Sequence, residues 1–206
     1  MIMNILGICA SHRKGGGTYR LLEEAMRGVK EEDQTVDTRI IELAGLKIGP
    51  CIATCGYDKA VGCAKHPFEC NVTDDLQLVY EEMKQADGIL LASPRYFIVP
   101  SKLQALIERL YCANYWTRLK NPSMPSPLMN KPFGILTTSS SDAYSAIPLQ
   151  EHLEEFLLWL QMIPVTVQKW PFRGVYGRFP VSEDARALEL ARQLGRDIVK
   201  SATKRT

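Results

Sequence analysis

Short apolar runs alternate with amphipathic helical patterns along this chain, and this alternation limits the fold more than any other feature. Runs at residues 5–10, 88–93 and 133–138 are mostly apolar and have the length of strands, and two more strands are expected at residues 36–43, which contain β-branched residues, and at residues 165–170. Between them, apolar residues recur at helical spacing, as in Leu21, Leu22, Ala25, Met26 and Val29. Strands that alternate with helices form a parallel sheet with helices on both faces. The pattern predicts an α/β fold with a doubly wound, five-stranded parallel sheet.

The helices are predicted by stripes of apolar residues and by polar residues that can begin a helix. Asp74 and Asp75 precede a stripe over residues 76–86, and Ser101 precedes one over residues 103–110. Further helices are expected at residues 149–161 and, after Ser182-Glu183-Asp184, over residues 188–198. Four prolines in residues 121–132 predict a loop.

Size and charge limit the class of protein. A chain of 206 residues, 46% of them hydrophobic, can bury one core, so we expect a single domain over residues 1–206. Its 25 basic and 23 acidic residues argue against a nucleic-acid or membrane partner. No apolar run is long enough to span a bilayer, and the first residues lack the basic start of a signal peptide. Six cysteines without an export signal favour reduced thiols in the cytoplasm.

A glycine-rich loop between the first strand and the first helix favours an anion. Its sequence, Ser-His-Arg-Lys-Gly-Gly-Gly-Thr, starts at residue 11 and contains no acidic residue. Backbone N–H groups at a helix N-terminus, together with cationic side chains, bind phosphate. The candidate residues are Ser11, Arg13, Lys14, Gly16, Gly17 and Thr18. The loop matches neither the dinucleotide nor the P-loop pattern, and a solvated surface turn is the alternative.

Two further loops follow strands that would end near this one. In a doubly wound sheet of order 2-1-3-4-5, the carboxyl ends of strands one and three open the crevice where ligands bind. The third strand is followed by Pro94, Arg95, Tyr96 and Phe97, whose aromatic rings are suited to cover a flat ligand. The fourth strand leads into Thr138, Ser139 and Ser140, which offer hydrogen bonds at the same edge. Core packing of the aromatic rings is the alternative.

Four of the six cysteines lie within twenty residues, in an irregular segment after the second strand. Cys51, Cys55, Cys63 and Cys70 follow the spacing C-x3-C-x7-C-x6-C. Thiolates are the usual ligands of iron–sulfur clusters and frequent ligands of structural zinc. A [4Fe–4S] cluster, a zinc site and free thiols therefore remain as alternatives, with His66 as a substitute ligand. Cys9 and Cys112 are expected to be core residues.

Taken together, these motifs resemble the NADPH-dependent FMN reductase superfamily, and within it the iron–sulfur flavoproteins, from about residue 3 to residue 199. The resemblance rests on three groups of residues. These are Ser11-x-Arg13 with Gly-Gly-Thr18, Pro50-Cys51 with Asp74-Asp75, and Ser93-Pro94-x-Tyr96-Phe97 followed by Leu103-x-Ala105-Leu106-Ile107-x-Arg109. Two features depart from the family: Gly17 replaces a frequent Asn or Ser, and the compact C-x2-C-x2-C cluster motif is absent.

The resemblance implies a flavodoxin-like fold, non-covalent FMN and a homodimer or homotetramer. It also implies a [4Fe–4S] cluster near the flavin, which relays electrons between a donor such as ferredoxin and an acceptor. The alternatives are an NAD(P)H-dependent FMN or quinone reductase without a cluster, and a non-catalytic flavin-binding module. No side-chain acid or base is required, so no catalytic residue is predicted. Tyr111, Tyr115 and Trp116 are expected at a subunit interface or in the core.

Overall fold

The structure, a computed structural model, describes residues 2–53, 63, 66–169 and 173–204. Its centre is a sheet in which every strand pairing is parallel. The strands are β1 (Asn4–Cys9), β2 (Asp37–Glu42), β3 (Gly88–Pro94), β4 (Pro132–Ser139), β5 (Ile163–Pro164) and β6 (Val175–Arg178). They lie in the order β2-β1-β3-β4-β5, with β6 also paired to β4. The predicted fold class and the order 2-1-3-4-5 are confirmed.

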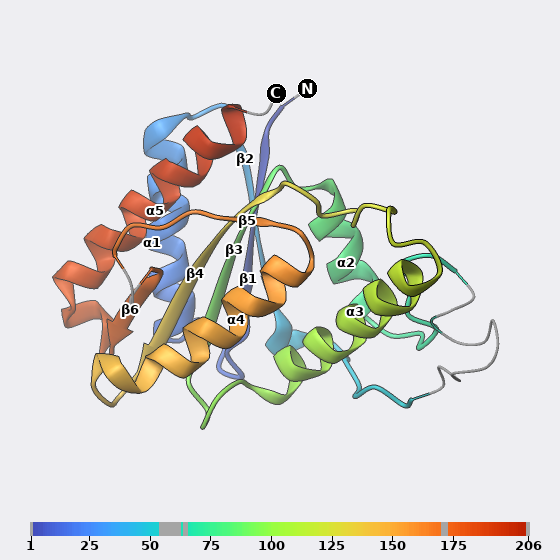
Figure 1. Cartoon of the computed structure of the whole chain (residues 1–206). Coiled ribbons are helices and arrows are strands. Elements are labelled where there is room, and N and C mark those ends of the chain that lie inside the picture. Colours follow the sequence, from blue (N-terminus) through green and yellow to red (C-terminus); the bar gives the residue numbers. More distant parts are fainter. Residues whose placement is uncertain (1, 54–62, 64–65, 170–172, 205–206) are drawn as a thin grey trace.

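Helices cover both faces of this sheet (Figure 1). On one face lie α1 (Gly17–Glu32) and α5 (Ala185–Thr203), and on the other lie α2 (Leu76–Gln85), α3 (Ser101–Lys120) and α4 (Ile147–Trp159). Three short 3-10 turns, η1 (Leu43–Gly45), η3 (Ala143–Ala146) and η4 (Val181–Glu183), join them. Each helical layer has its own buried cluster of apolar side chains. β3 is buried at every position, because it is central and covered on both faces.

The fifth position of the sheet differs from the prediction. A single strand over residues 165–170 is wrong, because the described residues 165–169 lie outside any strand. Instead, β5 pairs with the first two residues of β4, and β6 pairs with the last four. The chain leaves the edge after Pro164 and returns at Val175. A Cβ on Gly174 would lie 2.5 Å from the Ile135 carbonyl oxygen, so only glycine allows this close return.

The starts of two helices can be compared with the prediction. Asp184 begins α5 as predicted, since its carboxylate accepts a hydrogen bond from the Ala187 N–H at 3.0 Å. The predicted cap on α3 is different, because Ser101 is already the first helical residue and makes no capping bond. None of the helices in the described part of the chain is long and apolar enough to cross a membrane.

Candidate functional site

A cavity of about 310 Å³ opens at the carboxyl ends of β1, β3 and β4, beside the N-terminus of α1. This is the switch point of the sheet, because β1 is followed by connections that lead to strands on either side of it. The residues described along its wall come from the predicted loops and from the link after β6. They are Ser11, Arg13, Gly16, Gly17, Thr18, Pro94, Arg95, Tyr96, Thr138, Ser139, Ser140, Phe179 and Val181. None of these residues is acidic.

The N-terminal turn of α1 is open to an anion. Gly16 occupies the cap position without a capping side chain, and the first turn carries no acidic residue. The Ser11 hydroxyl is almost fully buried and accepts a hydrogen bond from the Arg13 N–H at 3.0 Å, which shapes the loop. Uncapped N–H groups and the helix dipole both favour negative charge. The geometry therefore suits a phosphate at this end of the cavity.

Two hydroxyls lie at the floor of the cavity, between the loop at residues 11–18 and β4. The Thr18 and Thr138 Oγ1 atoms are 2.7 Å apart, although the two residues are 120 positions apart in the chain. Both side chains are buried, with exposed fractions of 4% and 6%. The Arg95 N–H donates to the Thr138 carbonyl at 2.8 Å. These two bonds join all three predicted loops into one site.

Two of the predicted residues, Lys14 and Phe97, are not among the described lining residues. The Lys14 ammonium lies next to Gly45 in η1. Phe97 has a positive φ of 59° and is 87% exposed, so its ring stands in solvent. A positive φ is unfavourable for a bulky residue. Tyr96 does line the cavity, and its ring stacks on that of His12 with 5.4 Å between centroids.

The sequence did not point to three residues near the cavity. Phe179 and Val181 line it from the segment after β6, and Tyr176 supports its β4 side. The Tyr176 hydroxyl lies 3.3 Å from Ser139 Oγ and donates to the Ser141 carbonyl. The strand predicted at residues 165–170 lies too early in the chain, so the segment after β6 that reaches the site was not recognised.

Two of the described cysteines, Cys63 and Cys70, lie near each other. Cys63 Sγ is 4.0 Å from Oδ1 of Asn71, the residue after Cys70, and the Arg109 Nε–H donates to Cys70 Sγ at 3.2 Å. The hydrogen bond from Cys63 is the main cause that lowers the pKa of Cys70 to about 5, and Arg109 adds to it. Among the residues the structure describes, no three His, Cys, Asp or Glu side chains are grouped to hold a metal. Cys55 lies outside the described residues.

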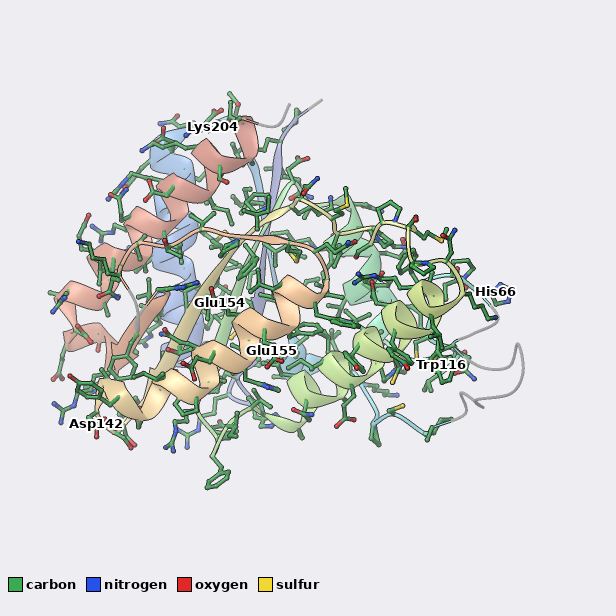
Figure 2. The ribbon with its side chains drawn as sticks, viewed as in Figure 1. His66, Trp116, Asp142, Glu154, Glu155 and Lys204 are labelled. Carbon is green, nitrogen blue, oxygen red and sulfur yellow. The ribbon has the colours of Figure 1, made fainter. Side chains whose placement is uncertain are left out.

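The other cysteines and His66 have different surroundings. Cys9 is fully buried in the core, as predicted, and burial raises its pKa to about 11. Cys112 is partly buried and packs against a small buried cluster of Cys63 and Trp116, apart from the two large clusters. Figure 2 shows Trp116 on α3, and His66 further out on the same side of the molecule. His66 is exposed.

The sheet order and a cavity at the switch point define a flavodoxin-like α/β protein, a class in which ligands bind at the carboxyl ends of the strands. The chain belongs to the NADPH-dependent FMN reductase family, whose model matches residues 3–175.

Individual proteins that are similar to this chain support its assignment to the family. An iron–sulfur flavoprotein of Methanocaldococcus jannaschii is 37% identical over 108 residues, which are 52% of this chain and 51% of that protein. One of Archaeoglobus fulgidus is 27% identical over 210 residues, covering 97% and 96% of the two chains. The chain spans about half the length of the first of these relatives. A solved flavone reductase has a TM-score of 0.70 at 18% identity, covering 98% of this chain and 63% of its own, which shows the shared fold.

Proposed function

We propose that the chain binds FMN at the switch-point cavity and works as a flavin-dependent oxidoreductase. The convergence of three loops on one cavity, with an open helix N-terminus at one end, is the observation that carries the proposal. Ser11, Arg13 and residues 16–18 would hold the phosphate. Pro94–Tyr96 and Thr138–Ser140 would contact the ring system.

The residues present suit this cofactor. Buried hydroxyls and uncapped N–H groups offer donors to phosphate oxygens, and no acidic side chain among the described lining residues repels them. Bound FMN supplies hydride and single-electron transfer. The protein would bind and orient it, and Phe179 and Val181 would offer apolar surface beside it. The family favours NADPH as the electron donor.

We further propose that Cys51, Cys55, Cys63 and Cys70 bind a [4Fe–4S] cluster that exchanges electrons with a protein such as ferredoxin. The names of the relatives support this, as does the Cys63–Cys70 pair with its acidic thiol. The described residues supply two neighbouring sulfurs, fewer than the four a cluster needs, so no electron-transfer step is assigned to it. Reduced thiols of this kind favour the cytoplasm as the site of action.

Chemical analysis of anaerobically purified protein tests both proposals. We expect one FMN per chain and oxidation of NADPH when a quinone or free flavin is added. Bound FMN without turnover would favour a non-catalytic module. About four irons with acid-labile sulfide, lost in each cysteine-to-serine variant, would support the cluster. Stoichiometric zinc, or no metal, would leave a flavin reductase without a cluster.

We also propose that the chain forms a homodimer through α3 and α4. A groove of about 460 Å³ between these helices is lined mainly by apolar residues. Tyr111 and Leu158 at this groove remain 43% and 46% exposed. Burial of such a face in a second copy removes apolar surface from water. Light scattering should show a dimer for the native chain and a monomer for Leu158→Asp. A native monomer would contradict the proposal.

A further inference from the structure

Arg109 is the largest of the fully buried side chains in the described structure. It projects from α3 on the same side as Leu106 and Leu110, which belong to the core. A buried guanidinium is costly unless all its donors are paired. The partners of Arg109 therefore show which part of the molecule this buried side chain stabilises.

Among the described residues, the four hydrogen-bond partners of Arg109 lie at or just beyond the two ends of the cysteine segment, defined here as residues 50–70. Before the segment, the Gly49 carbonyl accepts from Nη1 at 3.1 Å. At its end, Cys70 Sγ accepts from Nε at 3.2 Å, the Val72 carbonyl from Nη2 at 2.9 Å, and Asp74 Oδ2 from Nη1 at 2.6 Å. The same Asp74 oxygen accepts from the Gly49 N–H at 2.9 Å. The Arg109 guanidinium thus connects the two ends of the cysteine segment through hydrogen bonds.

Other residues of α3 contact Phe68 and Cys63 of the segment. The Thr117 hydroxyl accepts a hydrogen bond from the buried Phe68 N–H at 2.7 Å. Cys63 is 4% exposed and packs against Trp116. Cys63 Sγ also lies 4.0 Å from Oδ1 of Asn71, the residue after Cys70. Cys63 and the Cys70 end of the segment are therefore neighbours against the side of α3.

We propose that Arg109 is the positioning residue of the cysteine segment, and that it fixes the Cys70 sulfur beside that of Cys63 as one dithiol site. The planar guanidinium reaches four acceptors at once, which the single ammonium of a lysine cannot do. The site would take a soft, thiophilic centre. The inference concerns the metal-free chain and does not depend on the proposed cluster.

Phenylarsine oxide tests the spacing of the two sulfurs directly. Each thiol forms one sulfur–arsenic bond, and the arsenic oxygen leaves as water with both thiol protons, so no oxidant is needed. Metal-free protein with Cys51, Cys55 and Cys112 changed to Ser is the reference, and it should bind one equivalent. Loss of binding on Cys63→Ser or Cys70→Ser identifies the pair. No tight binding by the reference would overturn the proposal.

Arg109→Lys keeps the positive charge and removes the planar guanidinium that reaches several acceptors at once. We expect the affinity for the arsenical to fall at least about tenfold, the effect of losing one hydrogen bond to a charged donor. Arg118→Lys is the matched control on the same helix, and should bind as the reference does, because Arg118 packs over Trp159 instead. Equal affinity in Arg109→Lys and the reference would refute the role.

Hydrogen exchange separates positioning from a general loss of stability. In Arg109→Lys, the amides of Gly49 and Phe68 should exchange faster, while those of α5 keep their rates. A lower free energy of unfolding with unchanged arsenical affinity and uniformly faster exchange would show a merely structural role. Asp74→Asn, which leaves the guanidinium in place, is the second variant if Arg109→Lys does not fold, and should give a smaller loss of affinity.

Discussion

The buried hydrogen bond between Thr18 and Thr138 gives a quantitative test of the cavity. Thr18→Val keeps the shape of the side chain but leaves the Thr138 hydroxyl without its partner. Both residues are at most 6% exposed, so the hydroxyl that remains has little contact with solvent. An unsatisfied buried hydroxyl costs about 1–3 kcal/mol. Thr138→Val should cost a similar amount for the same reason.

The double variant should lose much less than the sum of the two single variants. Replacing both partners of a buried hydrogen bond by apolar groups of the same shape is nearly neutral. The expected coupling energy is therefore about 1–2 kcal/mol, within the range found for residues in contact. Urea unfolding of the four proteins without cofactor measures it. For a chain of this size, each kcal/mol also shifts the melting temperature by about 2–4 °C.

Additive losses would contradict this reasoning. They would mean that the two hydroxyls are not paired, and that the loops at residues 11–18 and 138–140 do not meet as described. Flavin titration of the same variants adds a functional reading. Each single variant should bind FMN more weakly than the native chain, because its cavity floor is no longer fixed.

The remaining predictions concern side chains around the two candidate sites. Arg13→Ala should weaken FMN binding by about 1–3 kcal/mol through loss of a charge-assisted hydrogen bond, and an unchanged fluorescence titration would remove Arg13 from the site. Tyr96→Ala should alter the visible spectrum of bound flavin, whereas Phe97→Ala should not, because Phe97 is 87% exposed and is not among the described lining residues of the cavity. Identical spectra for both variants would contradict a contact between Tyr96 and the flavin. In metal-free protein, the folded Cys70 has a pKa of about 5 against an ordinary value of 9.0, so between these values the unfolded chain binds more protons. The contribution of the Cys70 thiolate to the free energy of unfolding should be complete above pH 9 and be lost as the pH falls towards 5. If the unfolding free energy of Cys70→Ser has the same pH dependence as that of the native chain, this expectation is wrong.

The central sheet could be predicted from the sequence because its strands are buried. Gly88–Pro94 is apolar at nearly every position, as a strand covered on both faces must be. The edge could not be predicted equally well. Residues 165–169 alternate apolar and polar side chains as a strand would, yet the strand that pairs with the end of β4 starts at Val175. Which segment pairs there depends on the close return at Gly174, a tertiary contact without a local signature.

The candidate site shows the same division. The loops after β1, β3 and β4 could be predicted to meet, because the ends of parallel strands lie at one edge of a sheet. Phe179 and Val181 could not, since they follow the strand that was misplaced. Arg109 did leave a signal: it stands three residues after Leu106 within an apolar stripe, where a charged residue must find partners. The sequence alone could not name those partners.

The position of α3 bears on how this protein can diversify. The helix starts directly after the loop at residues 94–100, and Arg109 follows Ser101 by eight residues, about 12 Å along the axis. One inserted residue between them would rotate Arg109 by about 100° and separate it from Asp74. The stretch of α3 between Ser101 and Arg109 thus serves both ends of the helix at once. We therefore expect its length to stay constant in evolution, because a change there would uncouple the loop before α3 from the ends of the cysteine segment.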